Sequence, residues 1–203
     1  MGKTEELFKN PTAEYRGKPF WSWNGKLEKS ELLRQIEVFR QMGMGGYFCH
    51  SRIGLETEYL GNEWFDLINS CAEKGASLGM ETWLYDEDRW PSGIAGGMVT
   101  KHRENRMKLR MTVLESCEDT DRTDAVAVFA VNLDGLSFSG KERISSGSQA
   151  GGRTVLKFTV EDMVREDSCN GYTYLDTMKR EATECFIKET HEKYRENCGQ
   201  HFG

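Results

Sequence analysis

The sequence predicts an α/β protein in which about four strand–helix units are interrupted by an antiparallel, β-rich insertion. Up to about residue 104, apolar strands alternate with helices of roughly 15 residues, a pattern typical of βαβ units and a parallel sheet. After His102 the composition changes to alternating β-rich segments separated by polar turns. We therefore expect four segments: an N-terminal approach at 1–18, three βα units at 19–104, the insertion at 105–168, and a fourth strand and helix at 169–203.

The first unit is a short strand and turn at Pro19–Gly25, followed by an amphipathic helix at Glu28–Met42. Apolar side chains recur on one face of this helix at helical spacing. Gly43 is expected to end the helix as its C-cap, because glycine readily adopts the left-handed conformation found there. The predicted buried face comprises Leu32, Leu33, Ile36, Phe39 and Met42.

The second unit begins with a buried strand at Gly45–Arg52. Asn62 is a plausible N-cap for the next helix, which should run to Leu78. A third strand at Met80–Tyr85 then leads into a run of acids. Parallel strands joined in this way should have right-handed crossovers. The apolar stripe predicted for the second helix comprises Trp64, Phe65, Ile68, Cys71 and Ala72.

The insertion should contain about three antiparallel strands, because three segments alternate apolar and polar residues between polar turns. These segments are Met107–Leu114, Ala125–Leu133 and Thr154–Val160. A short strand is expected to return at Tyr172–Leu175, and a final helix at Thr177–Asn197.

Composition excludes several classes of function. The net charge is −6 and the pI about 5.4, and no basic face stands out, so nucleic acid is not an expected partner. No apolar run approaches the roughly 20 residues that span a bilayer, and the N-terminus lacks a signal-peptide core, so we expect a cytoplasmic protein without a membrane partner. The six cysteines have no zinc-like spacing. Their even number permits disulfides, but free thiols in a reducing compartment are the favoured interpretation.

The most informative stretch is the strand end WLYDEDRWPSG at residues 83–93, where an aromatic run stops at three consecutive acids. Carboxylates beside aromatics at a strand end are a common way to build a carbohydrate site. Because side chains alternate along a strand, Asp86 and Glu87 should face opposite sides. We therefore expect Glu87 to be the pocket-facing catalytic acid, beside Tyr85, and Asp86 to be the weaker candidate, a loop or cap residue. The alternative is an acidic loop that caps the next helix.

Two further candidates end the second strand. His50 and Arg52 are two residues apart, so they share a face. Arg52 could bind sugar hydroxyls or a carboxylate, and His50 could do the same or ligate a metal. The alternative for both is an ordinary solvated strand end. The stretch GIAGG at 93–97 matches neither dinucleotide nor Walker patterns, so no nucleotide cofactor is expected.

Aromatic and polar residues around the strand ends complete the predicted substrate site. Trp23 and Trp90 could stack on a sugar face, although at least one of Trp21 and Trp23 should belong to the core. Asn24, at the end of the first strand, could hydrogen-bond a sugar hydroxyl. Ser92 lies in the turn that follows the acids.

The motifs PFWSWNG, GGY, YDE and WPSG together resemble the start of a (β/α)₈ glycoside hydrolase, most closely glycoside hydrolase family 106, the α-L-rhamnosidase-like enzymes, and its relatives in gut bacteria. The resemblance covers about residues 15–100 and resumes more weakly near the end of the chain. It implies a partial TIM-type barrel, a carbohydrate partner and acid/base carboxylates. Some family members bind calcium, so calcium is implied by the resemblance alone. The residues themselves predict no metal site and no cofactor.

A complete eight-unit barrel needs about 250 residues. The chain therefore reads as the first half of one, either a truncated gene product or an excised piece, and should hydrolyse glycosides poorly or not at all. The alternative is a non-catalytic sugar-binding module or half-barrel scaffold. An unfinished barrel predicts a partner, either a second copy in a homodimer or the missing C-terminal half.

Overall fold

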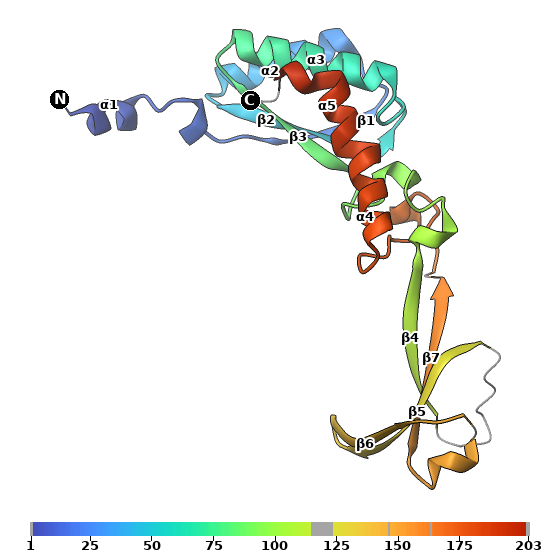
Figure 1. The fold of residues 1–203 in the computed structure, drawn as a ribbon. Helices are drawn as coiled ribbons and strands as arrows, with labels where there is room; N and C mark the ends of the chain where they lie inside the picture. The colour runs from blue at the N-terminus through green and yellow to red at the C-terminus, as the bar shows by residue number, and fades with distance from the viewer. Residues whose placement is uncertain (1, 115–123, 146, 163, 202–203) are drawn as a thin grey trace.

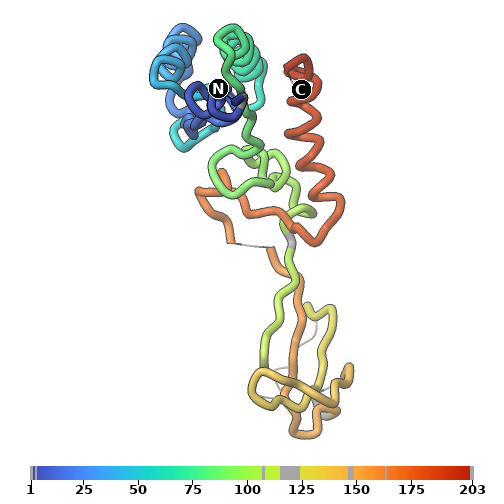
Figure 2. Tube along the Cα trace, turned by 90° about the vertical axis from the view of Figure 1, so that its left-hand side faces the viewer, coloured from blue at the N-terminus to red at the C-terminus, as the bar shows by residue number. Residues whose placement is uncertain are grey.

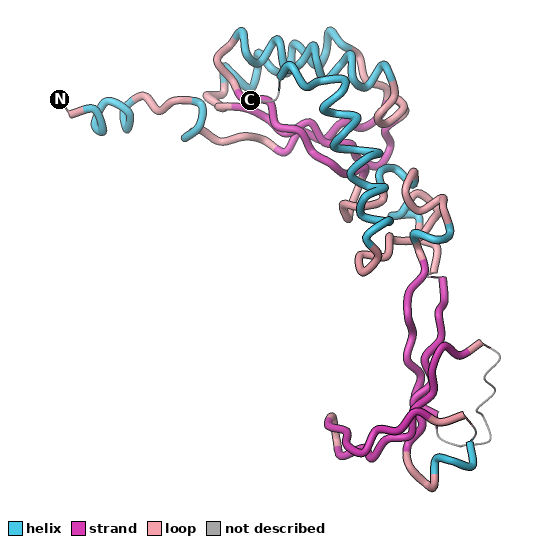
Figure 3. Tube along the Cα trace, in the orientation of Figure 1, coloured by secondary structure: helices cyan, strands magenta, loops and turns pink. Residues whose placement is uncertain are grey.

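The computed structural model describes residues 2–114, 124–145, 147–162 and 164–201. It shows an α/β protein with two separate sheets, one parallel and one antiparallel (Figures 1 and 3). The helices are α1 (Lys3–Lys9), α2 (Lys29–Gln41), α3 (Asn62–Ser77), α4 (Arg180–Ile187) and α5 (Lys193–Cys198), and the strands are β1 (Phe20–Gly25), β2 (Gly46–Leu55), β3 (Glu81–Asp88), β4 (Met107–Leu114), β5 (Ala125–Asp134), β6 (Ser137–Arg143) and β7 (Thr154–Asp162).

The parallel sheet has the order β1-β2-β3, with α2 and α3 connecting successive strands. The three parallel strands and the two helices between them that the sequence predicts are present, but β3 is followed by short 3-10 turns at Ala95–Gly97 and Arg103–Asn105 in place of the α-helix of a third βα unit. Among the described residues the sheet does not close into a barrel. Gly43 adopts a φ of 82° immediately after α2, as expected for a residue that ends a helix in the left-handed conformation.

Helices α2, α3 and α5 cover one face of this sheet, and the main core lies between these helices and the sheet (Figure 1). Trp21 and Trp23 of β1 point into it, as do Tyr47 and Cys49 of β2. The predicted helix stripes also face this core, with one exception: Met42 is exposed, because α2 ends at Gln41. The core residues contributed by helices are Leu32, Ile36, Trp64, Phe65, Leu67, Ile68, Cys71, Tyr194 and Cys198.

The other face of the parallel sheet is open and aromatic. Phe20, Phe48 and Trp83 lie side by side across β1, β2 and β3, because strand register pairs Phe20 with Phe48 and Phe48 with Trp83. Phe20 is 50% exposed and Trp83 is 46% exposed. Lys18 lies over the Trp83 ring, 5.6 Å from its centroid, and pairs with Glu81 at 3.4 Å. We call this surface the open face.

The insertion forms a four-stranded antiparallel sheet in the order β4-β7-β5-β6. Its β4–β7 ribbon extends away from the parallel sheet in both views (Figures 1 and 2). The sequence predicts β4, β5 and β7 but not β6, whose seven residues are all exposed and show no apolar alternation. A small core on one side of this sheet contains Val128, Ala130, Ile144, Ala150 and Val155.

The expected fourth strand at Tyr172–Leu175 is absent from the described sheets. Tyr172 makes only an isolated bridge with Glu166, and the Tyr174 hydroxyl donates to the Ser92 carbonyl at 2.9 Å. The backbone of Tyr172 bonds locally instead of to a strand edge: its carbonyl accepts from the Glu166 N–H and its N–H donates to the Cys169 carbonyl. The final helical run spans α4 and α5, joined by one π-helical turn at Lys188–Glu192.

Two other expectations concern the cysteines and the ends of helices. The five described cysteines carry free thiols, and Cys117 lies outside the described residues. The N-cap of α3 is Gly61 rather than Asn62, a shift of one residue. None of the described helices has the length and apolar character needed to cross a membrane.

Candidate functional site

Glu87 lies at the carboxyl end of β3, almost fully buried at 3% exposed, and contacts His50. A register shift brings them together: Cys49 pairs with Leu84, but Ser51 pairs with Asp88, so two residues of β2 span four of β3. The Glu87 carboxyl oxygen Oε1 lies 3.3 Å from His50 Nε2. Burial raises the pKa of Glu87, and the nearby charge of Asp86 raises it further. This environment favours a protonated carboxyl group.

The proton on His50 can be assigned from its neighbours. Nε2 also lies 3.3 Å from the Arg89 carbonyl oxygen, which can only accept a hydrogen bond, so Nε2 carries a proton. Nδ1 is buried and has no hydrogen-bond partner within the described part of the chain. Burial lowers the pKa of His50, which favours neutral imidazole. The two side chains thus form a largely uncharged pair and not a buried ion pair.

Aromatic rings enclose this pair on the open face. The His50 ring centroid lies 4.3 Å from that of Phe20 and 4.5 Å from that of Tyr85, which meets it edge-on. Arg52 follows His50 on β2 and is exposed. Its positive charge adds to the lowering of the His50 pKa, and it partly opposes the effect of burial, which raises the pKa of Glu87. The site therefore combines an apolar wall, a buried carboxyl group and an exposed guanidinium.

Asn24 and Trp90 border the same end of the sheet. Asn24 is exposed near the end of β1, and its position in the strand places it on the face that also carries Phe20. Trp90 is exposed in the loop directly after β3. Both side chains are therefore accessible to a ligand.

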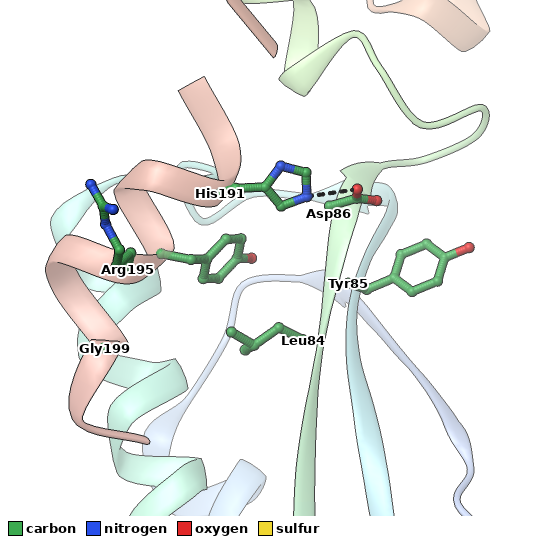
Figure 4. A pocket seen from close by; sticks show the side chains of 7 residues that line it. Leu84, Tyr85, Asp86, His191, Arg195 and Gly199 are labelled. Atoms are coloured by element: carbon green, nitrogen blue, oxygen red, sulfur yellow. Dashed lines mark hydrogen bonds and ion pairs between the residues drawn. The ribbon is translucent and has the colours of Figure 1, made fainter. Parts of the chain in front are cut away.

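Asp86 points to the other side of β3, toward α5. Its carboxylate accepts a hydrogen bond from Ser92 Oγ at 2.8 Å and lies 3.1 Å from His191 Nε2 (Figure 4). It lines a pocket of about 540 Å³ between β3 and α5, together with Leu84 and Arg195. Asp86 thus holds Ser92 in place in the loop that follows Glu87. In this arrangement Asp86 is a positioning residue for the loop.

The Asp88 carboxylate is also hydrogen-bonded to neighbouring side chains. It accepts hydrogen bonds from Ser51 Oγ and from Asn170 Nδ2, the latter at 3.1 Å. The next residue, Arg89, has a φ of 72°, which is unusual for a residue with a side chain, and donates to the Asp167 carbonyl at 3.0 Å. This bend coincides with the approach of the Arg89 carbonyl to His50.

Trp23 does not lie at the site. It is 1% exposed and packs in the core, with its ring 5.0 Å from Trp64 and 5.3 Å from Trp21. Alternation along β1 puts both tryptophans under the helices and gives the open face to Phe20 and Asn24. The expectation that Trp23 binds substrate is therefore corrected.

Sequence reasoning missed four residues of the site region: Phe20, Asn170, Tyr174 and His191. Three of them come from the end of the chain, far from β3 in sequence, and carry no local motif. His191 is exposed and contacts Asp86. Asn170 has a φ of 56°, a conformation that asparagine tolerates better than most residues, but the sequence alone does not link it to Asp88.

No group of three or more His, Cys, Asp or Glu side chains suited to a metal occurs among the described residues. Calcium therefore remains an implication of the sequence resemblance only.

Comparisons with known proteins give limited information. No protein-family model matches the chain, and no curated protein matches it. One solved structure, described as that of a rhamnosidase from Novosphingobium sp. PP1Y, is similar over 68% of this chain, with 17% sequence identity and a TM-score of 0.44. The chain spans 16% of the length of that rhamnosidase. A similarity this weak supports no inference about the site.

Proposed function

We propose that the chain is a glycoside-hydrolase-like fragment whose open face binds a rhamnoside-like carbohydrate at the carboxyl ends of β1–β3, as part of a TIM-type barrel. The observation that carries the proposal is the buried Glu87, whose pKa is raised by burial and which contacts His50 near the charge of the exposed Arg52. Sugars offer C–H faces that pack on aromatic rings and hydroxyls that pair with polar groups. Phe20, Tyr85 and Trp90 supply the former and Arg52 and Asn24 the latter.

Glu87 suits the role of general acid. Glycoside hydrolysis needs a protonated carboxyl group to donate to the leaving oxygen, and a raised pKa keeps that proton bound at higher pH than in an ordinary glutamate. His50 donates from Nε2 to the Arg89 carbonyl, which fixes the ring beside Glu87.

Hydrolysis also needs a second carboxylate, roughly 5–5.5 Å away for retention or 6.5–9.5 Å away for inversion. The two acids adjacent to Glu87 are engaged elsewhere: Asp86 with Ser92 and His191, and Asp88 with Ser51 and Asn170. This observation favours the second candidate function for the chain alone, a sugar-binding module without turnover. The isolated chain is then expected to bind but not hydrolyse.

Two measurements on the purified chain test the proposal. Calorimetric titration with methyl α-L-rhamnoside should show millimolar binding that Arg52→Ala weakens about tenfold, equivalent to ~1.4 kcal/mol. Arg34→Ala, on the helix-covered side, is the matched control and should bind normally. Equal binding by wild type and Arg52→Ala, or no binding by either, would contradict the site.

The second measurement is release of nitrophenol from 4-nitrophenyl α-L-rhamnoside. We expect no turnover above that of Glu87→Gln. Turnover by the wild type that Glu87→Gln abolishes would overturn the binding-only interpretation of the chain and establish catalysis by Glu87.

A further inference from the structure

The insertion carries a second uncovered surface, which differs in chemistry from the open face. Strand register sets Leu109 opposite Val160, Met111 opposite Phe158, and Val113 opposite Leu156. Ala127 and Phe129 of β5 continue the last two rows, beside Phe158 and Leu156. We call this surface the arm face and define it by Leu109, Met111, Val113, Ala127, Phe129, Leu156, Phe158 and Val160.

The arm face is apolar throughout, yet much of it meets solvent. Its four outer aliphatic residues, Leu109, Met111, Val113 and Val160, are between 42% and 60% exposed. An antiparallel sheet with one solvated face normally turns its polar residues outward. Here the same strands carry their charges on the opposite face, where Arg110 pairs with Glu161 at 3.0 Å. A contiguous apolar surface of this kind is a candidate interaction site.

The chemistry of the arm face indicates its partner. It offers no cation for nucleic acid and no side-chain hydrogen-bond donor for sugar hydroxyls. Its residues are mostly aliphatic, and the β4–β7 ribbon that carries them projects into solvent in both views (Figures 1 and 2). Such a surface fits another apolar protein surface, and two sheets pack well face to face at about 10 Å.

We propose that the arm face binds the arm face of a second copy of this chain, forming a two-fold dimer by sheet-on-sheet packing. A two-fold contact places each patch against itself, so any charge on it would meet a like charge. The arm face has none, although the chain as a whole carries a net charge of −6. Electrostatic repulsion between two copies of the chain is therefore weakest at this surface.

The rival dimer uses the uncovered edge of β3. Antiparallel self-pairing of β3 about Leu84 would set the charged Glu81 opposite the uncharged Glu87 carboxyl group, so the strand pair would gain no cross-strand ion pair there. The open face itself holds the polar His50–Glu87 pair, for which we propose a sugar ligand. Neither objection applies to the arm face, and the dimer proposal does not depend on the proposed function.

Size sets the expected strength of the dimer. Three strands about 4.8 Å apart and five residues of about 3.4 Å each give a patch of roughly 14 by 17 Å. This is well below the ~800 Å² per partner of a stable interface, so association should be weak and concentration-dependent.

Sedimentation of the full chain over a concentration series tests the proposal. The wild type should pass from monomer to dimer, and Met111→Lys should raise the concentration at half-dimer at least about tenfold. Thr112→Lys, the next residue on the opposite face of β4, is the matched control and should dimerise like the wild type. Met111 is already 53% exposed, so circular dichroism and the melting temperature should be unchanged in its variant.

Three outcomes would overturn the proposal: a wild type that stays monomeric at every concentration, equal dimerisation by Met111→Lys and Thr112→Lys, or loss of the dimer in Trp83→Lys but not in Met111→Lys. The last result would assign the contact to the open face.

Discussion

Replacing Glu87 with glutamine should stabilise the protein by an amount that grows with pH. The ordinary pKa of glutamate is 4.5, and burial raises that of Glu87 in the folded protein. Between these two values the unfolded chain has released a proton that the folded chain still holds. The stability of the wild type therefore falls as pH rises through this window, by up to about 1.4 kcal/mol per pH unit. Glutamine cannot ionise, so the stability of the variant lacks this dependence on pH.

Urea unfolding followed by tryptophan fluorescence, from about pH 4 to about pH 8, measures this effect. All five tryptophans lie between residues 21 and 90, so the signal reports on the parallel sheet and its helices. The free-energy difference between variant and wild type should rise from its value near pH 4 and level off above the folded pKa. Each ~1.4 kcal/mol of the rise corresponds to one pKa unit.

The titration of His50 makes stability depend on pH in the opposite direction to that of Glu87. The pKa of His50 is lowered, so the unfolded chain takes up a proton below about pH 6.5 before the folded chain does, and stability falls as pH decreases. This loss should occur in both proteins and largely cancel in the difference. Glu73→Gln, at an exposed position on α3, is the matched control and should show no such rise. A difference that falls as pH rises would refute the reasoning, because it would mean that Glu87 is ionised and paired with protonated His50.

Three further substitutions test the packing around the site, each by urea unfolding. Gly93→Ala should cost about 1–3 kcal/mol, because Gly93 has a φ of 125° and an added Cβ would lie 2.5 Å from Leu175 Cδ2; an unchanged midpoint would contradict the loop geometry. Trp64→Ala should cost about 3–5 kcal/mol through its core cavity and the lost bond to the Tyr194 hydroxyl, and a cost below ~1 kcal/mol would place Trp64 outside the core. Ser51→Ala should cost about 1–3 kcal/mol by removing one of the two donors to the buried Asp88 carboxylate, the other being Asn170 Nδ2, and a neutral result would show that this bond is absent.

The parallel sheet could be predicted from sequence because local periodicity determines it. Each strand and helix between Pro19 and Asp88 carries its own apolar pattern, and each lies where that pattern indicates. Alternation also separates Glu87, beside His50, from Asp86, beside His191. For β1, alternation alone left open which face the helices would cover, which is why Trp23 stayed a candidate for the site.

The remaining features depend on contacts that no local pattern encodes. The segment Tyr172–Leu175 has the composition of a strand, but the Tyr174 hydroxyl binds the Ser92 carbonyl and the segment stays irregular. Strand β6 pairs through its backbone while all its side chains face solvent, so it lacks a sequence signal. The register shift between β2 and β3, which brings Glu87 to His50, is likewise a property of strand pairing and not of either strand alone.

The indole N–H signals of the five tryptophans, followed by NMR during titration with methyl α-L-rhamnoside, test the central claim most directly. Trp90 is exposed beside the proposed site. Trp23 and Trp64 are buried in the core between the sheet and the helices, and they serve as internal controls. A carbohydrate site at the open face predicts that the Trp90 signal shifts with saturation and that those of Trp23 and Trp64 do not. Saturable shifts confined to the buried tryptophans, or no shift at all at high millimolar sugar, would contradict it.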